Sequence, residues 1–152
     1  MFPTKIFFTA VVCVFALNTN AWAQTSPPPT DSTYEPVVGQ PGKDVIWVPT
    51  AQTLVDRMLD MAELKPEDRL VDLGSGDGRT VITAAKRGAM AHGIEYNPKM
   101  VALSIQAAKA EGVSDHATFE QADIFKSDFS NATVVTLFLL PELNLRLRPT
   151  LL

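Results

Sequence analysis

Short apolar segments alternate with amphipathic helical segments along most of this chain, and this alternation constrains the fold more than any other feature. Hydrophobic periodicity predicts strands over 69–73, 91–95, 118–122 and 133–139, and helices over 79–86 and 98–110. A helix between two strands returns the chain to the edge where the first strand began, so such strands are parallel. We therefore predict an α/β fold, preceded by an amphipathic helix that begins near Thr50 and ends before Pro66.

The segment VDLGSGDGRT joins the first predicted strand to the helix that follows it through a glycine-rich loop. The glycines of this loop are Gly74, Gly76 and Gly78. Glycines let a ligand approach the backbone, and the N-terminus of the next helix favours a negatively charged ligand group. The loop also carries Asp77, and Asp72 lies in the strand just before it. These acids disfavour a phosphate-bearing ligand and favour one with positively charged groups.

Acidic side chains are predicted at the carboxyl ends of three strands, where ligands of open parallel sheets bind. Besides Asp72, Glu95 ends the second strand (HGIEYNP) and Asp123 follows the third (EQADIF). Glu95 stands where such folds place a carboxylate that accepts hydrogen bonds from a ribose, which indicates a nucleoside. A nucleoside with an ammonium and a sulfonium, S-adenosylmethionine, suits these acids better than a dinucleotide. Arg79 also replaces the third glycine of the dinucleotide motif.

This ordered set of motifs resembles the class I S-adenosylmethionine-dependent methyltransferases, which have a Rossmann-like three-layer sandwich fold. VDLGSGDG is similar to their first motif, GIEYN to the acidic end of their second strand, and QADIF to the acid before their adenine pocket. The resemblance implies that the glycine loop holds the methionine part of S-adenosyl-L-methionine, Glu95 the ribose, and Asp123 with Ile124 the adenine. The implied cofactor-binding residues are Asp72, Gly74, Ser75, Gly76, Asp77, Gly78, Glu95, Tyr96, Asp123 and Ile124.

Two further segments, WVPT (47–50) and TVVTLFLLPELNLRLRP (133–149), resemble a small family of protein-lysine methyltransferases. Mitochondrial members of that family act on the adenine nucleotide translocase and the ATP synthase c subunit. The resemblance implies a methyl-acceptor protein that presents a lysine. In this family the segment after the fourth strand faces the acceptor, so Pro141, Glu142 and Asn144 are the candidate catalytic residues.

Several of these residues also have purely structural explanations. Gly74 and Gly78 would serve a tight turn and close packing of helix against strand. Asp77 would cap the helix that begins near Arg79, and Glu142 and Asn144 would cap the helix after the fourth strand. Trp47 belongs either to the core or to a cover over the cofactor.

The first 23 residues are typical of a secretory signal peptide. Lys5 precedes an apolar run over 6–17, and Ala21-Trp22-Ala23 provides an A-x-A cleavage site. The run is shorter than the roughly 20 residues that span a bilayer. We therefore expect export, to the periplasm or the exterior if the source is bacterial, with membrane contact only through this segment. Export is in tension with the cytosolic supply of S-adenosylmethionine.

The rest of the chain is predicted to consist of a lead-in and one domain. Residues 24–46 are rich in proline and glycine and are expected to be a linker. Residues 47–152 are expected to be the cofactor-binding part of a methyltransferase domain. The resemblance to class I methyltransferases implies a seven-stranded sheet. We therefore expect the fold to be C-terminally truncated after the fourth strand, and this strand to form an exposed apolar edge of the sheet.

Charge and composition exclude some classes of partner. The net charge is −4 and the sequence has no run of Lys or Arg, which disfavours nucleic acid as a partner. No metal site is predicted, because the one cysteine lies in the signal segment and no His-x-x-x-His pair occurs. Two alternatives to a methyltransferase remain: an exported, non-catalytic nucleoside- or partner-binding relic, and a nicotinamide-dependent oxidoreductase.

Overall fold

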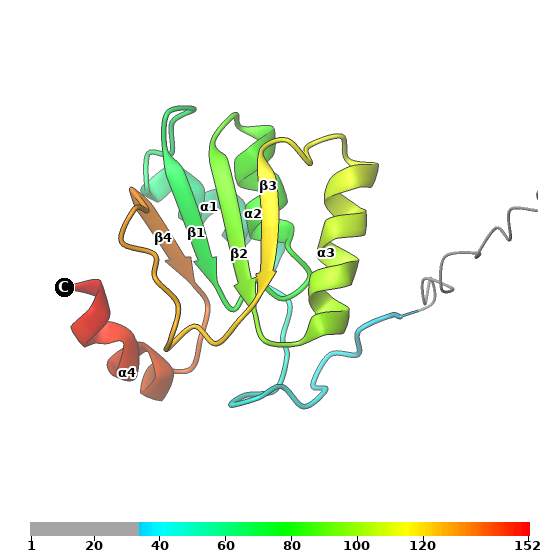
Figure 1. Ribbon diagram of the computed structural model, residues 1–152, viewed down its shortest axis with the longest axis vertical. Helices are drawn as coiled ribbons and strands as arrows, with labels where there is room; N and C mark the ends of the chain where they lie inside the picture. Colours follow the sequence, from blue (N-terminus) through cyan, green and yellow to red (C-terminus); the bar gives the residue numbers. More distant parts are fainter. Residues whose placement is uncertain (1–33) are drawn as a thin grey trace, which may run out of the picture. The chain divides into compact units, whose positions relative to one another are not determined.

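A computed structural model of the protein describes residues 34–152, and within them the predicted alternation of elements is confirmed (Figure 1). The predicted signal peptide (1–23) and the first residues of the lead-in lie outside the described residues. In chain order the elements are α1 (Gln52–Met61), β1 (Arg69–Leu73), α2 (Arg79–Lys86), β2 (Met90–Glu95), α3 (Pro98–Ala110), β3 (Ala117–Gln121), β4 (Val134–Leu137) and α4 (Pro141–Leu151). The fourth strand is thus shorter than the predicted 133–139. None of the helices in this part of the chain has the length and hydrophobicity to cross a membrane.

The strands form one parallel sheet with the order β3-β2-β1-β4. Leu70 of the central strand β1 is in register with Ala91 of β2 on one side and with Val134 of β4 on the other. All four carboxyl ends therefore lie along the same edge of the sheet, at the bottom of Figure 1. The glycine loop, Glu95 and the residues after β3 and β4 meet at this edge.

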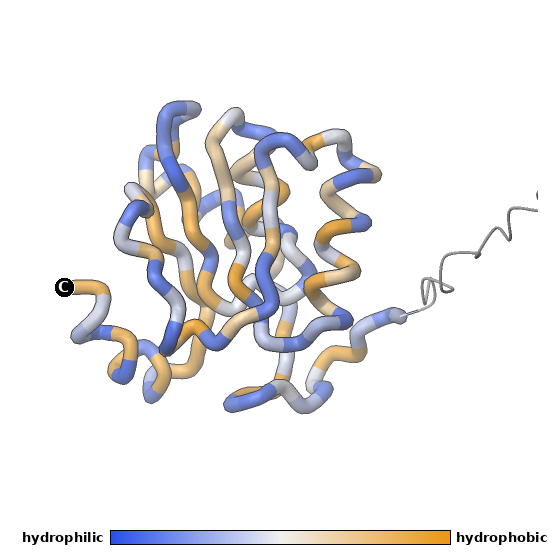
Figure 2. Tube along the Cα trace, in the orientation of Figure 1, coloured by the Kyte–Doolittle hydropathy of each residue, from blue (hydrophilic) through white to orange (hydrophobic). Residues whose placement is uncertain are grey.

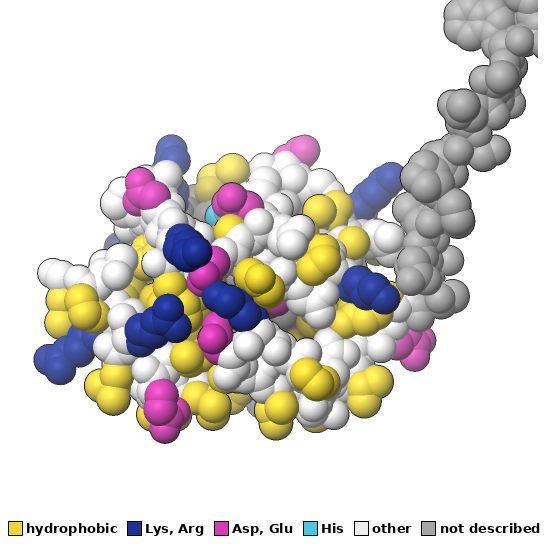
Figure 3. Space-filling model, turned by 60° about the horizontal axis from the view of Figure 1, so that its bottom comes forward, with side chains coloured by type: hydrophobic (Ala, Val, Ile, Leu, Met, Phe, Trp, Pro, Cys, Tyr) yellow, Lys and Arg dark blue, Asp and Glu magenta, His cyan; other side chains and the backbone are white. Residues whose placement is uncertain are grey.

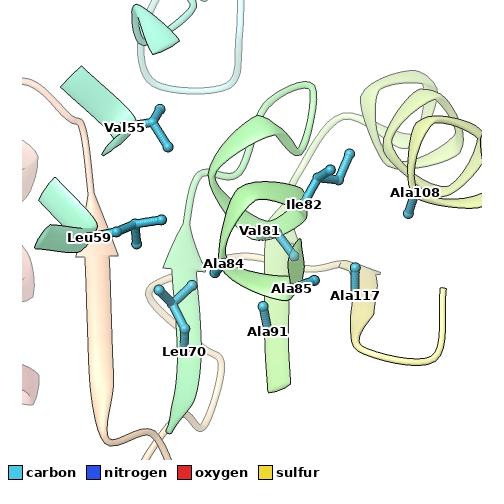
Figure 4. Packing of buried hydrophobic residues seen from close by; sticks show 10 residues of the cluster. All are labelled: Val55, Leu59, Leu70, Val81, Ile82, Ala84, Ala85, Ala91, Ala108 and Ala117. Carbon is cyan, nitrogen blue, oxygen red and sulfur yellow. The ribbon is translucent and has the colours of Figure 1, made fainter. Parts of the chain in front are cut away.

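One face of the sheet packs against α1, α2 and α3. Alternate residues of a strand point to opposite faces, and Leu70 of β1 belongs to the hydrophobic cluster under these helices (Figure 4). Helix α2 contributes two β-branched residues, Val81 and Ile82, and two alanines, Ala84 and Ala85. The cluster consists of Val55, Leu59, Leu70, Val81, Ile82, Ala84, Ala85, Ala91, Ala108 and Ala117.

The other face is covered by α4 and by the segment between β3 and β4. Val71, Leu73 and Ile94 of the strands are buried there with Phe129 and with Leu147 of α4. Segment 122–133 crosses this face without forming a helix. Figure 2 shows hydrophobic residues within the sheet and a hydrophilic turn before β1. The sheet is therefore the middle layer of three, as predicted.

The glycine loop is packed so tightly that Gly78 tolerates no side chain. Its φ is +81°, and a Cβ atom there would lie 2.7 Å from Phe119 of β3 and 2.7 Å from Ser104 of α3. The packing explanation for this glycine is thus well supported. Gly112, after α3, has a φ of +69° but has no atom within 4 Å of its Cβ position.

We expect Gly78→Ala to destabilise the fold much more than Gly112→Ala does. Both substitutions place a side chain in the left-handed region, at a cost of about 1 kcal/mol, but only the first adds a steric clash, worth about 2 kcal/mol more. Denaturant unfolding of both variants measures the difference. Equal losses of unfolding free energy would contradict the packing argument.

Candidate functional site

The backbone of the glycine loop is tied to the end of β2. The N–H groups of Gly74 and Ser75 donate to the carbonyl oxygen of Ile94, at 2.9 and 3.1 Å. The N–H of Gly76 donates to Oε2 of Glu95 at 3.0 Å, and Oε1 of Glu95 accepts from the N–H of Asn97 at 2.8 Å. The Glu95 carboxylate is therefore held in place beside the loop by two backbone donors.

A pocket opens at the carboxyl edge of the sheet, on the side that faces forward in Figure 3. Eight of the predicted cofactor-binding residues line it: Asp72, Gly74, Ser75, Asp77, Glu95, Tyr96, Asp123 and Ile124. Gly76 and Gly78 are not among its lining residues. A Cβ atom at Gly76 would lie 2.8 Å from Nε1 of Trp47, so Gly76 leaves room for Trp47 as Gly78 leaves room for Phe119 and Ser104.

Asp72 is a buried carboxylate beneath the pocket. Its side chain is hydrogen-bonded by Thr136 of β4, whose Oγ1 donates to Oδ1 at 2.7 Å. Burial raises the pKa of Asp72 to about 6; hydrogen bonds from Thr136 and Thr80 oppose this increase, and the nearby charges of Glu95 and Asp77 add to it. Asp72 therefore changes its charge near neutral pH, beside a site where a positively charged ligand would stabilise the ionised form.

Asp77 pairs with Arg79 at the start of α2. Nε of Arg79 donates to Oδ1 of Asp77 at 2.9 Å, and Nη2 donates to Oδ2. The backbone N–H of Arg79 also donates to Oδ1, at 3.3 Å. The N-cap of α2 is Gly78, however, so the prediction that Asp77 itself caps this helix is wrong, and Asp77 contacts only the first turn. Nη1 of Arg79 donates to the carbonyl oxygen of Thr50 at 2.8 Å. Arg79 thus connects the glycine loop to the segment that precedes α1.

That segment, residues 39–50, crosses the pocket and is called the strap below. Backbone hydrogen bonds between Gly39 and Trp47 (2.8 Å) and between Trp47 and Gln40 (2.9 Å) fold it back on itself. The sequence predicts a linker as far as residue 46, whereas in the structure residues 42–50 line the pocket. The prediction failed here because the order of the strap comes from contacts with the domain, which its proline- and glycine-rich composition does not reveal. Trp47 lies in this cover over the pocket.

Lys43 of the strap binds the acid predicted to face adenine. Its Nζ donates to Oδ2 of Asp123 at 2.7 Å and lies 4.9 Å from the centre of the Tyr96 ring. The N–H of Phe125 donates to the other carboxylate oxygen of Asp123 at 3.1 Å. The hydrogen bond from Lys43 holds the pKa of Asp123 below its ordinary value.

The candidate acceptor-side residues lie at the start of α4, beside the pocket but not among its lining residues. Pro141 and Glu142 are exposed in the first turn of α4. Asn144 is half-buried, and its Nδ2 donates to the carbonyl oxygen of Leu139 at 3.4 Å. The residues of this region that line the pocket are Phe138, Leu139 and Leu143. The catalytic assignment of Pro141, Glu142 and Asn144 stays a prediction.

The lining residues suit a nucleoside that carries positive charge. Five carboxylates and two basic side chains line the pocket, together with apolar walls such as Ile46, Ile124 and Leu139. Figure 3 shows acidic and basic side chains intermixed on this face among hydrophobic ones. The hydroxyl of Ser75 is buried against Gly93 of β2 and has no hydrogen-bond partner among residues 34–152. In the same part of the chain no group of three His, Cys, Asp or Glu side chains is placed to hold a metal ion.

Three residues of the site were not identified by sequence analysis. Lys43 and Thr136 contact acids that are 80 and 64 positions away in the chain, and no local pattern marks either contact. Arg79 had a detectable signal, because it directly follows the last glycine of the loop and begins the helix. In the sequence, Arg79 indicates only a departure from the dinucleotide motif.

Comparisons with known proteins find methyltransferases that are similar to this chain. The family model of the ANTKMT methyltransferase domain matches residues 72–152. A protein-lysine N-methyltransferase of Saccharolobus islandicus is 40% identical over 109 residues, which are 70% of this chain and 68% of the relative. The human lysine N-methyltransferase named for the C subunit of ATP synthase is 39% identical over 69% of this chain and 45% of its own length.

A solved structure is also similar to this chain. The RNA methyltransferase from Salinibacter ruber, in complex with S-adenosyl-L-homocysteine, is 51% identical with a TM-score of 0.67. The match covers 68% of this chain and 69% of that chain. The chain thus spans about two thirds of two of these proteins and less than half of the human relative.

The raised pKa of Asp72 predicts a specific dependence of stability on pH. The folded chain binds this proton more tightly than the unfolded chain does, so the contribution of Asp72 to the unfolding free energy is greatest below about pH 4 and falls as pH rises through about 6. Between about pH 4.5 and about pH 8 the loss amounts to about 2 kcal/mol. The Asp72→Asn variant has no ionisable group at this position, so it should not show this loss of unfolding free energy.

The measurement is denaturant unfolding of both proteins at the two pH values. From the lower to the higher pH, the unfolding free energy of the Asp72→Asn variant should increase relative to that of the wild type. A difference that stays constant would show that Asp72 keeps its ordinary pKa in the folded chain. Carboxylates away from the pocket titrate equally in both proteins and cancel in the comparison, so the remaining difference reports on Asp72 and the two acids, Glu95 and Asp77, whose charges act on it.

Proposed function

Because the chain belongs to the ANTKMT methyltransferase domain family, we propose that it transfers a methyl group from S-adenosylmethionine to the side-chain amine of a lysine in a protein. The observation that carries this proposal is the convergence of the glycine loop and the acids of three strand ends on one pocket that has more carboxylates than basic groups.

The expectations for fold and cofactor are confirmed. The chain has the Rossmann-like fold of S-adenosylmethionine-dependent methyltransferases, and a solved structure that is 51% identical binds S-adenosyl-L-homocysteine, the product of that cofactor. The related proteins are named as methyltransferases, which gives no support to a nicotinamide-dependent oxidoreductase or a non-catalytic relic. The acceptor and the activity of the whole protein remain proposals, as does export.

Each end of the pocket matches one part of the cofactor. The cofactor supplies an electrophilic methyl group on a sulfonium. Asp72 and the glycine loop would hold the methionine part, with Asp72 and Asp77 close to its positive charges. Glu95, fixed by the N–H groups of Gly76 and Asn97, would accept hydrogen bonds from the ribose. Asp123 and Ile124 would face the adenine.

A lysine amine is the acceptor that the electrostatics of the site favour. The excess of carboxylates attracts an ammonium side chain to the pocket. Methyl transfer needs the amine deprotonated and in line with the methyl group, so the pocket mainly has to orient it. The Saccharolobus and human relatives are named as lysine N-methyltransferases. The Salinibacter protein is named as an RNA methyltransferase, but an acidic chain with a net charge of −4 is poorly suited to RNA.

We expect Glu95→Gln to weaken binding of S-adenosylmethionine at least tenfold, which is about 1.4 kcal/mol. The substitution removes the negative charge that accepts from the ribose and also disturbs the support of the glycine loop. Calorimetric titration of the 152-residue chain measures the affinity. Glu111→Gln is the matched control, because Glu111 pairs with Lys86 on the surface, away from the pocket. Equal losses in both variants would contradict the assignment of Glu95.

The acceptor class is tested by the location of the transferred label. The chain is incubated with cofactor labelled in its methyl group and with a mixture of cellular proteins and RNA. We expect the label to be sensitive to protease and to appear as methyl-lysine after acid hydrolysis. Label that is lost on ribonuclease treatment would overturn the lysine proposal while leaving the methyltransferase activity intact.

A further inference from the structure

The predicted site contains no positively charged side chain for the carboxylate of the cofactor, and the basic residues of the pocket can supply one. The methionine part of the cofactor carries an ammonium and a carboxylate. The predicted residues at that end, Asp72, Ser75 and Asp77, offer two carboxylates and a hydroxyl. Two carboxylates suit the ammonium but repel the ligand carboxylate. Among the described lining residues the basic side chains are Lys43 and Arg79.

Arg79 is held in place and retains free hydrogen-bond donors. A guanidinium has five N–H donors, and Asp77 and Thr50 take three of them. Among residues 34–152, Nη1 and Nη2 therefore each keep one donor without an acceptor. The side chain is one-third exposed and lines the pocket beside the glycine loop. A guanidinium binds a carboxylate through two N–H donors in one plane. The guanidinium of Arg79 is therefore available to bind a ligand carboxylate.

We propose that Arg79 binds the carboxylate of the methionine part of S-adenosylmethionine, with Asp77 orienting its guanidinium. The inference rests on the proposed function only in taking S-adenosylmethionine as the ligand. Arg79 is the first residue of α2, so the partial positive charge of the helix N-terminus adds to that of the guanidinium. Without Arg79, the ligand carboxylate would face Asp72 and Asp77 unopposed.

Lys43 is less suited to this task because it is engaged at the other end of the pocket. Its ammonium pairs with Asp123 at 2.7 Å and lies over the Tyr96 ring. These partners follow β3 and β2, at the end assigned to adenine and ribose. Lys43→Met therefore serves as the matched control, since it removes one positive charge from the same pocket without removing the group beside the glycine loop.

The experiment compares the affinities for S-adenosylmethionine and for decarboxylated S-adenosylmethionine, which differ only in the carboxylate. Both ligands are titrated calorimetrically into the 152-residue wild type, Arg79→Met, Arg79→Lys and Lys43→Met. Thermal unfolding of each variant is recorded to compare their folds. We expect the wild type to prefer the carboxylate-bearing ligand by about tenfold or more. Arg79→Met should lose this preference, Arg79→Lys should keep part of it, and Lys43→Met should keep it all.

Two results would overturn the inference and leave the proposed function standing: a wild type that binds both ligands equally tightly, or an Arg79→Met variant that weakens both by the same factor. The second would show that Arg79 acts only by holding Asp77 and the strap. A wild type that binds neither ligand would overturn the proposed function itself.

Discussion

The turn of the glycine loop between β1 and α2 is the constraint on which the site depends. Gly78 lies against Phe119 and Ser104 with no room for a side chain, which fixes the distance between α2 and its neighbours α3 and β3. The same loop is bound at Gly76 by the carboxylate of Glu95. A single turn therefore sets the position of helix α2, the floor of the pocket and the orientation of the Glu95 carboxylate.

Electrostatic balance is the second determinant of the site. Carboxylates at neighbouring strand ends repel one another, and the protein offsets that repulsion in different ways. Asp72 is buried, with a pKa raised to about 6, whereas Asp77 and Asp123 pair with Arg79 and Lys43. Two basic side chains do not neutralise five acids, and the remaining negative charge favours a cofactor with a sulfonium and an acceptor with an amine.

The acids of the site could be predicted because their positions follow from local pattern. Glu95 is the last residue of one strand and Asp123 comes just after another. The carboxyl ends of parallel strands meet at one edge whatever the details of packing. The strap could not be predicted in this way. Its proline- and glycine-rich sequence is typical of linkers, and the contacts that order it, such as that of Lys43 with Asp123, join residues 80 positions apart.

The sequence by itself determined the parallel α/β sheet, the glycine loop and the acids around the pocket, because hydrophobic periodicity and glycine spacing act over short stretches of chain. The pair of Asp77 and Arg79 is local, but tertiary structure alone decided which distant partners the charged groups of the site have. The hydrogen bond from Thr136 to Asp72 depends on β4 lying beside β1, and that of Arg79 to Thr50 depends on the strap reaching the start of α2. Hydrogen bonds of this kind form only when segments that are distant in the sequence pack together. They determine how the charged side chains of the pocket are oriented toward a ligand.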